Sequence, residues 1–229
     1  MGASDRAGRN RRSMTVPDAP SGLTPFQVTG ATVFFSLPES DGFLLAGGAA
    51  LVAQNLTSRP TQDLDLFTRA GRGRVPAARD AFENAAHNRG WSVRRIRDTE
   101  TFCRLVVSGD DELLVDLALD SPPSLPPSTS IAGPTFGLEE LAGRKVIALF
   151  DRAEARDFAD VFALSQQYDN ELLLRRAAEI DAGFEPAVFA DMLRTLGRFA
   201  DNEIPVDPGK VAALRDFFHR WRLQLQSSR

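Results

Sequence analysis

Two aspartates separated by a single residue are the side chains in this sequence best suited to chemistry. Asp63 and Asp65 lie in residues 63–67, DLDLF, where acidic and apolar residues alternate. In a β-strand this period of two puts both carboxylates on one face and both leucines on the other. Paired carboxylates on one strand face can hold divalent cations against a triphosphate and assist phosphoryl transfer. The simpler alternative is the solvated face of an amphipathic strand.

A double glycine lies upstream of the aspartates and could bind phosphate. The apolar residues 43–45 are followed by Gly47 and Gly48, which can adopt backbone angles closed to other residues and let a ligand approach the main chain. Residues 49–54 then resemble a helix start, whose free N–H groups attract anions. Paired glycines, a short helix and an Asp-x-Asp strand together resemble the signature of the polymerase-β-like nucleotidyltransferase superfamily.

A third acid follows on a later predicted strand. After the aspartates we predict one helix and three strands, at residues 76–88, 91–96, 102–108 and 112–120. In the last of these, Asp116 lies between apolar residues, where an unpaired carboxylate would be costly to bury. A nucleotidyltransferase site needs a third acid from a neighbouring strand, and Asp116 is in the right order. Glu112 and Asp120 are weaker candidates because they lie nearer the ends of the run, and a solvent-facing Asp116 is the alternative.

Charged residues recur at helical spacing in the second half of the chain. Lys145, Arg156 and Asp160 would share one stripe of a continuous helix. The same winding would place Asp157 among apolar residues, so we expect the helix to break near residues 152–155, with Asp157 close to the start of the next helix. Arg156 and Asp160 are expected to pair in either case. A surface salt-bridge stripe of little energetic value is the alternative.

Composition limits the kind of protein this can be. The chain has 229 residues, 43% of them hydrophobic, which suffices for one large or two small domains. It has neither a bilayer-crossing apolar run nor a secretory signal, so we expect a cytoplasmic protein without membrane contact. Cys103, His87 and His219 are too few for a zinc set or a Cys/His catalytic pair. The net charge of −4 argues against general coating of nucleic acid, but arginines concentrated between Arg59 and Arg97 could contact an RNA backbone or simply solubilise a surface.

The distribution of residue types divides the chain into four parts. Residues 1–21 are rich in Gly, Ser, Arg and Pro and are expected to form a disordered tail. Residues 22–120 would form the catalytic core, beginning with a helix within residues 23–37. Residues 121–135, rich in Pro and Ser, would form a linker. Residues 136–229 would form an all-helical domain, with helices at 138–151, 156–167, 171–181, 186–199 and 208–226, so the expected fold class is α+β.

Taken together, the motifs resemble the AbiEii/AbiGii nucleotidyltransferase toxins, a family that includes the mycobacterial MenT-type tRNA-modifying toxins. The resemblance covers residues 44–164 and rests on Gly47-Gly48 with Ala50-Leu51, on Arg59 and Thr61 ahead of Asp63 and Asp65, and on Lys145 to Ala148, Arg152, Arg156-Asp157 and Asp160. It implies a polymerase-β-like core, a mixed sheet flanked by helices, followed by a helical domain. It also implies transfer of a nucleoside monophosphate from an NTP to the 3′ end of tRNA, with Mg²⁺ or, alternatively, Mn²⁺. One departure is Ala49, where a hydroxyl residue commonly follows the glycines and would contact the triphosphate.

Roles follow from the patterns and the resemblance together. We expect metal binding by Asp63, Asp65 and Asp116; nucleotide binding by Gly47, Gly48, Arg59, Lys145, Arg156 and Asp157; and catalysis by the three metal-binding acids with Lys145 and Asp160. Asp160 would orient Lys145 or assist proton removal. Two alternatives stay open, namely a protein hydroxyl as acceptor and a non-catalytic nucleotide-binding or antitoxin module. A cognate antitoxin is a further candidate partner.

Overall fold

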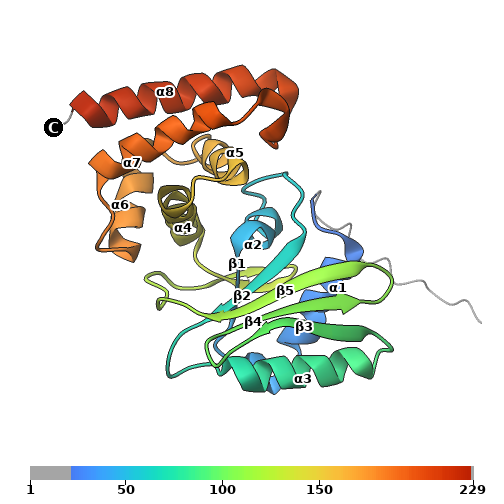
Figure 1. Cartoon of the computed structure of the whole chain (residues 1–229). Helices are drawn as coiled ribbons and strands as arrows, with labels where there is room; N and C mark the ends of the chain where they lie inside the picture. Colours follow the sequence, from blue (N-terminus) through green and yellow to red (C-terminus); the bar gives the residue numbers. More distant parts are fainter. Residues whose placement is uncertain (1–21, 228–229) are drawn as a thin grey trace, which may run out of the picture.

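The computed structural model describes residues 22–227, so the predicted disordered tail at residues 1–21 lies outside the described residues (Figure 1). The strands are β1 Leu44–Ala46, β2 Asp63–Thr68, β3 Ser92–Asp98, β4 Phe102–Ser108, β5 Glu112–Leu119, β6 Ser128–Ser130 and β7 Gly133–Thr135. The helices are α1 Pro25–Phe35, α2 Gly47–Ala53, α3 Val75–His87, α4 Leu138–Asp151, α5 Ala155–Leu164, α6 Asn170–Ile180, α7 Pro186–Met192 and α8 Val211–Ser227, with 3₁₀ turns at Pro38–Ser40, Leu193–Arg198, Asp201–Glu203 and Pro208–Lys210. Within these residues the strands form one mixed sheet in the order β3-β4-β5-β2-β1-β7-β6, which confirms the predicted α+β class.

Strand β2 has the alternation that its sequence predicts. Leu64 and Leu66 are buried, whereas Asp63 and Asp65 are half-buried. Strand β2 pairs antiparallel with β1 and parallel with β5, in a register that places Asp65 opposite Asp116. Because residues paired across neighbouring strands share a face, the three acids lie on one face of the sheet.

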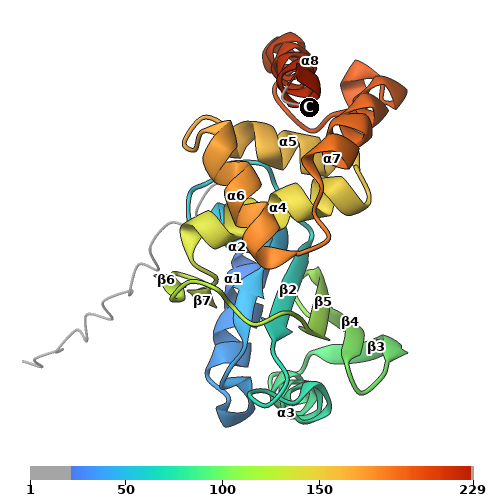
Figure 2. The same ribbon diagram turned by 90° about the vertical axis from the view of Figure 1, so that its left-hand side faces the viewer.

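Helices α1 and α3 cover the opposite face of the sheet, while α2 and the helices α4–α8 lie on the side of the acids (Figures 1 and 2). A capping box begins α1, because Thr24 and Gln27 each bond the other's backbone N–H. Phe34, fully buried on α1, packs edge-on against the rings of Phe43 and Phe82, at centroid distances of 5.3 Å and 5.7 Å. The predicted opening helix is therefore an integral part of the core.

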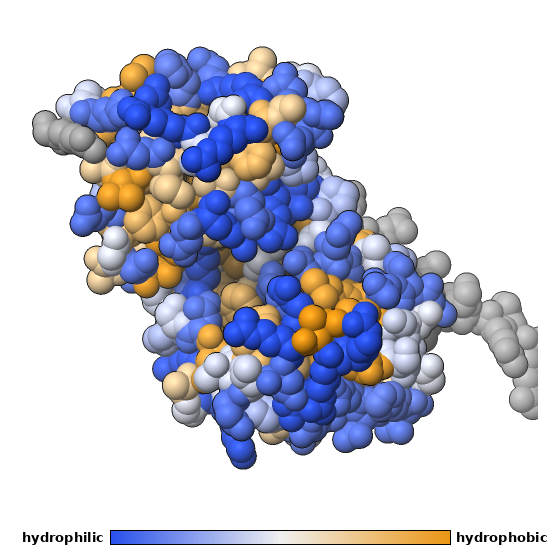
Figure 3. All heavy atoms as spheres, in the orientation of Figure 1, coloured by the Kyte–Doolittle hydropathy of each residue, from blue (hydrophilic) through white to orange (hydrophobic). Residues whose placement is uncertain are grey.

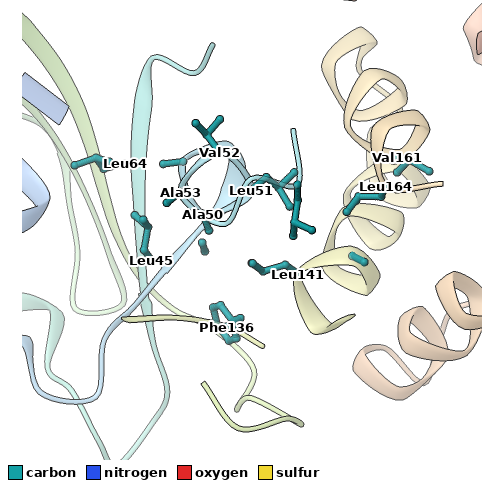
Figure 4. Packing of buried hydrophobic residues seen from close by; sticks show 14 of the residues in the cluster. Leu45, Ala50, Leu51, Val52, Ala53, Leu64, Phe136, Leu141, Val161 and Leu164 are labelled. Atoms are coloured by element: carbon teal, nitrogen blue, oxygen red, sulfur yellow. The ribbon is translucent and has the colours of Figure 1, made fainter. Parts of the chain in front are cut away.

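One apolar core joins the sheet to the C-terminal helices. Figure 4 shows α2 between the strands and α4, with Leu51 pointing toward α4 and Leu45 and Leu64 on the strand side. The same cluster continues to Leu141 on α4 and Val161 on α5. The helices are thus packed directly on the sheet through α2, and a domain boundary within residues 121–135 stays a prediction.

The Pro-rich residues 121–135 are built into the sheet. They contain β6 and β7, and β7 pairs in parallel with β1 at Leu45 and Thr135. Gln54 at the end of α2 donates a hydrogen bond from Nε2 to Thr135 Oγ1 at 2.7 Å. Pro134 is tolerated in β7 because this three-residue strand makes only short pairings, so little of the ladder depends on its missing N–H.

Several ends of the C-terminal helices differ from prediction, and α5 stops at Leu164 rather than at residue 167. The helix predicted for 186–199 stops at Met192 and continues as a 3₁₀ turn, where Thr195 Oγ1 donates to the Met192 carbonyl and so competes with regular helix bonding. The last helix begins at Val211 rather than at residue 208. The predicted break is confirmed, because α4 ends at Asp151, Ala153 has φ 48° and α5 begins at Ala155. None of the helices within residues 22–227 is long and apolar enough to cross a membrane.

Replacing Phe34 with alanine should lower the free energy of unfolding by about 3–5 kcal/mol, because it leaves a cavity where three aromatic rings meet. Urea denaturation followed by circular dichroism measures the change. As a control, Ile96→Ala on β3, where the side chain is 50% exposed, should change the value by no more than about 0.5 kcal/mol. Equal losses in both variants would contradict the assignment of Phe34 to the core.

Candidate active site

A cavity of about 490 Å³ lies between the acid-bearing face of the sheet and the helices α4, α5 and α6. Figure 3 shows the surface hollowed between the sheet and the C-terminal helices. The residues predicted for the site that line the cavity are Gly47, Gly48, Arg59, Asp63, Asp65, Asp116, Lys145 and Arg156. Residues distant in the sequence therefore meet around one space large enough for a nucleotide.

The double glycine lies directly against the acids. Gly47 has φ 61°, and a Cβ atom at this position would lie 1.7 Å from Asp65 Oδ2. A Cβ at Gly48 would lie 2.8 Å from Thr61 Oγ1. The first position therefore excludes any side chain on both backbone and steric grounds, and the second leaves very little room. These contacts bring the start of α2 close to the aspartates of β2.

Asp63 is held by the turn that precedes it. Thr61 Oγ1 donates to Asp63 Oδ1 at 2.7 Å, and the buried Gln27 donates from Nε2 to the Thr61 carbonyl at 2.9 Å. Helix α1, on the opposite face of the sheet, thus supports the turn that precedes Asp63. Thr61 was part of the family resemblance, and the structure shows what its hydroxyl contacts.

Asp65 carries an unusual proton affinity. Burial raises the pKa of Asp65, and the negative charges of Asp63 and Asp116 add to the effect, while Lys145 and Arg156 oppose it. The result is a pKa of about 7, compared with an ordinary value of 3.8. The main cause is burial, and the carboxylates that share this face of the sheet add to it.

Asp116 is engaged by a residue that sequence reasoning missed. Arg104 on β4 donates two hydrogen bonds to its carboxylate, from Nε at 2.8 Å and from an Nη atom at 2.6 Å. Arg104 also lines the cavity. Its pairing with Asp116 follows from the β4–β5 register, so the sequence alone offered no signal for it.

The donor set fits a divalent cation at Asp63 and Asp65. No group of three His, Cys, Asp or Glu side chains within residues 22–227 is arranged to hold a metal ion. The two β2 carboxylates nevertheless share one strand face, where the charge of Asp63 adds to the effect of burial on Asp65, and a hard cation between them would relieve that repulsion. Two carboxylates with substrate phosphates are a usual ligand set for Mg²⁺. Asp116 could join them only after leaving Arg104.

Asp160 is a fully buried acid that binds two cationic side chains. It accepts hydrogen bonds from Arg59 Nε at 2.9 Å and Nη at 3.0 Å, and its Oδ2 lies 2.8 Å from Lys145 Nζ. Burial alone would raise the pKa of Asp160, but the attraction of Lys145 and the bonds from Arg59 outweigh it and lower the pKa. Lys145 and Arg59 are thereby fixed at the edge of the cavity.

The predicted pair between Arg156 and Asp160 is wrong. Arg156 instead has its Nε 2.8 Å from Glu154 Oε2, and one Nη atom lies 3.9 Å from Asp63 Oδ2. Its buried Nε lacks an aligned hydrogen-bond acceptor. The break before α5 turns Asp160 toward Arg59, a partner 101 residues earlier that helical spacing cannot reveal.

Asp157 has the partner that its burial requires. Its carboxylate accepts two hydrogen bonds from Arg152, at 2.8 Å and 2.9 Å, and one from the Glu154 backbone N–H at 3.3 Å, closing the first turn of α5. This pairing joins the end of α4 to the start of α5. A contribution of Asp157 to nucleotide binding stays a prediction.

Arg144 is a second cavity residue that sequence reasoning missed. It lies 2.6 Å from Asp120 and 2.9 Å from Glu140, and its guanidinium lies over the ring of Phe136 at 3.8 Å from the centroid. It therefore ties the end of β5 to α4. Its helical spacing from Glu140 was a signal for a salt bridge but not for a cavity wall.

Removing the charge of Asp160 should destabilise the protein. We expect Asp160→Asn to lower the free energy of unfolding by about 3 kcal/mol, because Arg59 and Lys145 would be left without a buried counter-charge. The exposed pair of Asp216 and Arg220 provides the control, since Asp216→Asn should change the value by at most about 0.5 kcal/mol. Urea unfolding measures both, and a similar small effect in the two variants would contradict a stabilising role for Asp160.

The raised pKa of Asp65 predicts a pH dependence of stability. A proton binds this carboxylate more tightly in the folded than in the unfolded chain, so ionising it weakens the folded state. Without nucleotide or divalent cations, the stability of the wild type should fall relative to Asp65→Asn as the pH rises from about 4 to about 7. Urea unfolding in EDTA at several pH values tests this. A constant difference between the two proteins would show that Asp65 has an ordinary pKa.

Comparisons with known proteins agree with this geometry. The family described as nucleotidyl transferase AbiEii toxin, type IV toxin–antitoxin system, matches residues 34–227. No curated protein matches the sequence. The fold is similar to JHP933 from Helicobacter pylori, at 18% identity and a TM-score of 0.53 over 90% of this chain and 96% of that one. Another solved structure, described as a nucleotidyltransferase from H. pylori, gives 17% identity and a TM-score of 0.55 over 90% of this chain and 99% of that one. MenT4, a nucleotidyltransferase toxin from Mycobacterium tuberculosis, gives 15% identity and a TM-score of 0.50 over 88% and 94%.

These similarities to solved structures show the shared fold. The family match extends from the end of α1 to the end of α8 and includes every residue predicted for the site. The resemblance inferred from the sequence motifs is confirmed. The chain belongs to the AbiEii family of nucleotidyltransferase toxins from type IV toxin–antitoxin systems, and it is a nucleotidyltransferase.

Proposed function

We propose that this toxin transfers a nucleoside monophosphate from an NTP to the 3′ end of tRNA in the presence of Mg²⁺, with Mn²⁺ as the alternative ion. The observation that carries the proposal is the convergence of the Gly47-Gly48 bend, the acids of β2 and Lys145 around one cavity. The resemblance to tRNA-modifying toxins supports the choice of acceptor. A cognate antitoxin is proposed as its partner, in keeping with the type IV toxin–antitoxin family.

The side chains of the cavity divide into groups that bind and groups that orient. Asp63 and Asp65 would hold the cation, which when bound supplies positive charge to the triphosphate and the attacking oxygen. Backbone N–H groups at Gly47 and Gly48 would bind phosphate oxygens, since Ala49 offers no hydroxyl. Lys145 presents a positive charge at the cavity edge, where Asp160 holds it.

The transfer is an in-line displacement at the α-phosphate. The terminal 3′ hydroxyl of the acceptor forms a new P–O bond, the bond between the α-phosphate and the β-phosphate breaks, and pyrophosphate leaves. The hydroxyl proton needs an acceptor, for which Asp116 is proposed once its carboxylate is released by Arg104. The protein contributes mainly orientation and charge stabilisation, as is usual for phosphoryl transfer.

Asp160 is proposed as a positioning residue. It is fully buried, it does not line the cavity, and both its oxygens already bind Arg59 or Lys145. Of the two roles predicted for it, orientation of Lys145 therefore has direct geometric support. Proton removal by Asp160 would first require that these bonds break.

The Asp65→Asn variant tests the proposal directly. We expect it to lower the rate of nucleotide transfer about a thousandfold, because it removes several kcal/mol of charge stabilisation and each 1.36 kcal/mol corresponds to a factor of ten. The rate is measured with each labelled NTP and total tRNA. Asp110→Asn, at an exposed residue of the β4–β5 turn, provides the matched control and should be unchanged.

Parallel incubation with cell protein identifies the acceptor. Label in the tRNA fraction supports the proposal, and sequential removal of 3′ nucleotides should release that label first. Label in protein alone would overturn the tRNA acceptor while retaining the transferase. NTP binding without product in either pool would favour the non-catalytic alternative.

A further inference from the structure

The strands β3, β4 and β5 have two very different faces. Cys103, Leu105 and Val107 of β4 are fully buried on the side of α1 and α3, whereas Phe102 and Val106 on the other side are half-buried. Pairing in register extends this second face across the sheet, because Val106 lies opposite residue 114 and residue 104 lies opposite residue 116. The second face therefore includes Asp116 and borders the cavity of the proposed site.

The arginines that follow the aspartates in the sequence lie on different faces of the sheet. On the α3 side, Arg79 pairs with Asp80 and Asp98, and Arg95 pairs with Asp80, Glu83 and Asp98. This network satisfies both arginines locally. It accounts for part of the basic concentration as a surface salt-bridge network, leaving those guanidinium groups poorly available to a ligand.

The arginines on the face of the site have no such network. Arg94 pairs in register with Val106, and Arg97 with Arg104, so both belong to the second face. Both are exposed, and neither forms a salt bridge or a side-chain hydrogen bond with any other residue in the described range 22–227. Two cationic groups are thus available to an anionic partner at this edge of the sheet.

An aromatic ring, that of Phe102, lies beside two arginines of this face. The guanidinium groups of Arg97 and Arg104 lie 5.2 Å and 5.8 Å from the centroid of Phe102. Arg104 in turn donates to Asp116, which lies opposite Asp65. In Figure 3 a hydrophobic patch bordered by hydrophilic residues lies over this part of the sheet, below the hollow between the sheet and the C-terminal helices. A row of residues in register, Arg97, Arg104 and Asp116, therefore leads across the sheet to Asp65, and Phe102 lies beside its two arginines.

We propose that this arginine–aromatic face, formed by Arg94, Arg97, Phe102, Arg104 and Val106, binds the single-stranded end of the RNA acceptor. Single-stranded nucleic acids are bound by positive charge along the backbone and by aromatic side chains on which bases stack. The inference rests on the proposed function and adds where the acceptor lies. Arg94 and Arg97 bind phosphates, and Phe102 provides the stacking surface beside Arg97 and Arg104.

Local charge explains how an acidic protein binds RNA here. The net charge of −4 disfavours binding elsewhere on the surface, so the acceptor is directed to the sheet face where Arg94 and Arg97 are exposed without acidic partners in register. Glu112, at the far end of the same face from Phe102, limits this positive region to the side of the cavity. A peptide or a lipid would bind the apolar side chains of this face, such as Val106, but would not need a planar ring flanked by guanidinium groups.

The test uses the full chain and a labelled total tRNA pool. We expect Arg94→Gln with Arg97→Gln to weaken tRNA binding, measured by filter retention without NTP, at least tenfold. The negative slope of log affinity against log salt should become shallower by roughly 1.4, because each single-strand phosphate that an arginine neutralises contributes about −0.7 to it. The KM for tRNA should rise in parallel, with the KM for NTP and the kcat unchanged.

A second variant and a charge-matched control separate folding from binding. Phe102→Leu keeps an apolar side chain and should weaken tRNA binding at least fivefold, because leucine cannot stack on a base, with an unchanged melting temperature. Arg194→Gln with Arg220→Gln removes the same charge from exposed positions, 62% and 66% exposed, in the helical part of the chain and should bind tRNA as the wild type does.

The possible outcomes distinguish this inference from the proposed function. If the wild type labels tRNA but the Arg94/Arg97 variant binds it normally, the inference is overturned and the proposed function stands. Equal weakening in the control pair would also overturn it, because the effect would then reflect net charge alone. If the wild type neither binds nor labels tRNA, the proposed function itself fails, and the wild type alone reveals this.

Discussion

The architecture depends on one buried charge, Asp160. This side chain has no exposure to solvent and bonds both Arg59, in the segment before β2, and Lys145 on α4. A buried carboxylate is tolerated only when it is paired and hydrogen-bonded, so these three residues must stay together. Their contact fixes α4 and α5 over the acid-bearing face of the sheet. The cavity exists because this buried ion cluster, together with the apolar contacts of α2, holds both of its walls in place.

A second constraint is the closeness of Gly47 to Asp65. The carboxylate occupies the space that a side chain at residue 47 would need, which brings the start of α2 against β2. Burial and the neighbouring acids then raise the pKa of Asp65 to about 7. The site therefore combines compact packing with carboxylates on the sheet and cationic side chains on the helices. That separation of charge suits a ligand that brings both phosphates and a cation.

Much of the fold was predictable because local patterns agree with the tertiary structure. The alternation in β2 and the glycine bend identified the part of the chain that bears the acids, and the acid at residue 157 predicted the break between α4 and α5. Predictions were less accurate where a competing local interaction changes a helix end, as at Met192. The proline-rich residues 121–135 were predicted only as a linker, because short strands stabilised by Gln54 and Leu45 carry no periodic signal of their own.

The sequence by itself determined the family, the fold class and the placement of Asp63 and Asp65 on one strand face, since these depend on residue types at short and fixed spacings. Only the tertiary structure decided the partners of these residues. Arg59 rather than Arg156 pairs with Asp160, Arg104 engages Asp116, and the arginines of β3 divide between two faces. The physical reason is that each of these contacts depends on strand register or on helix placement across many residues. A one-residue shift of register would send every side chain to the opposite face of the sheet.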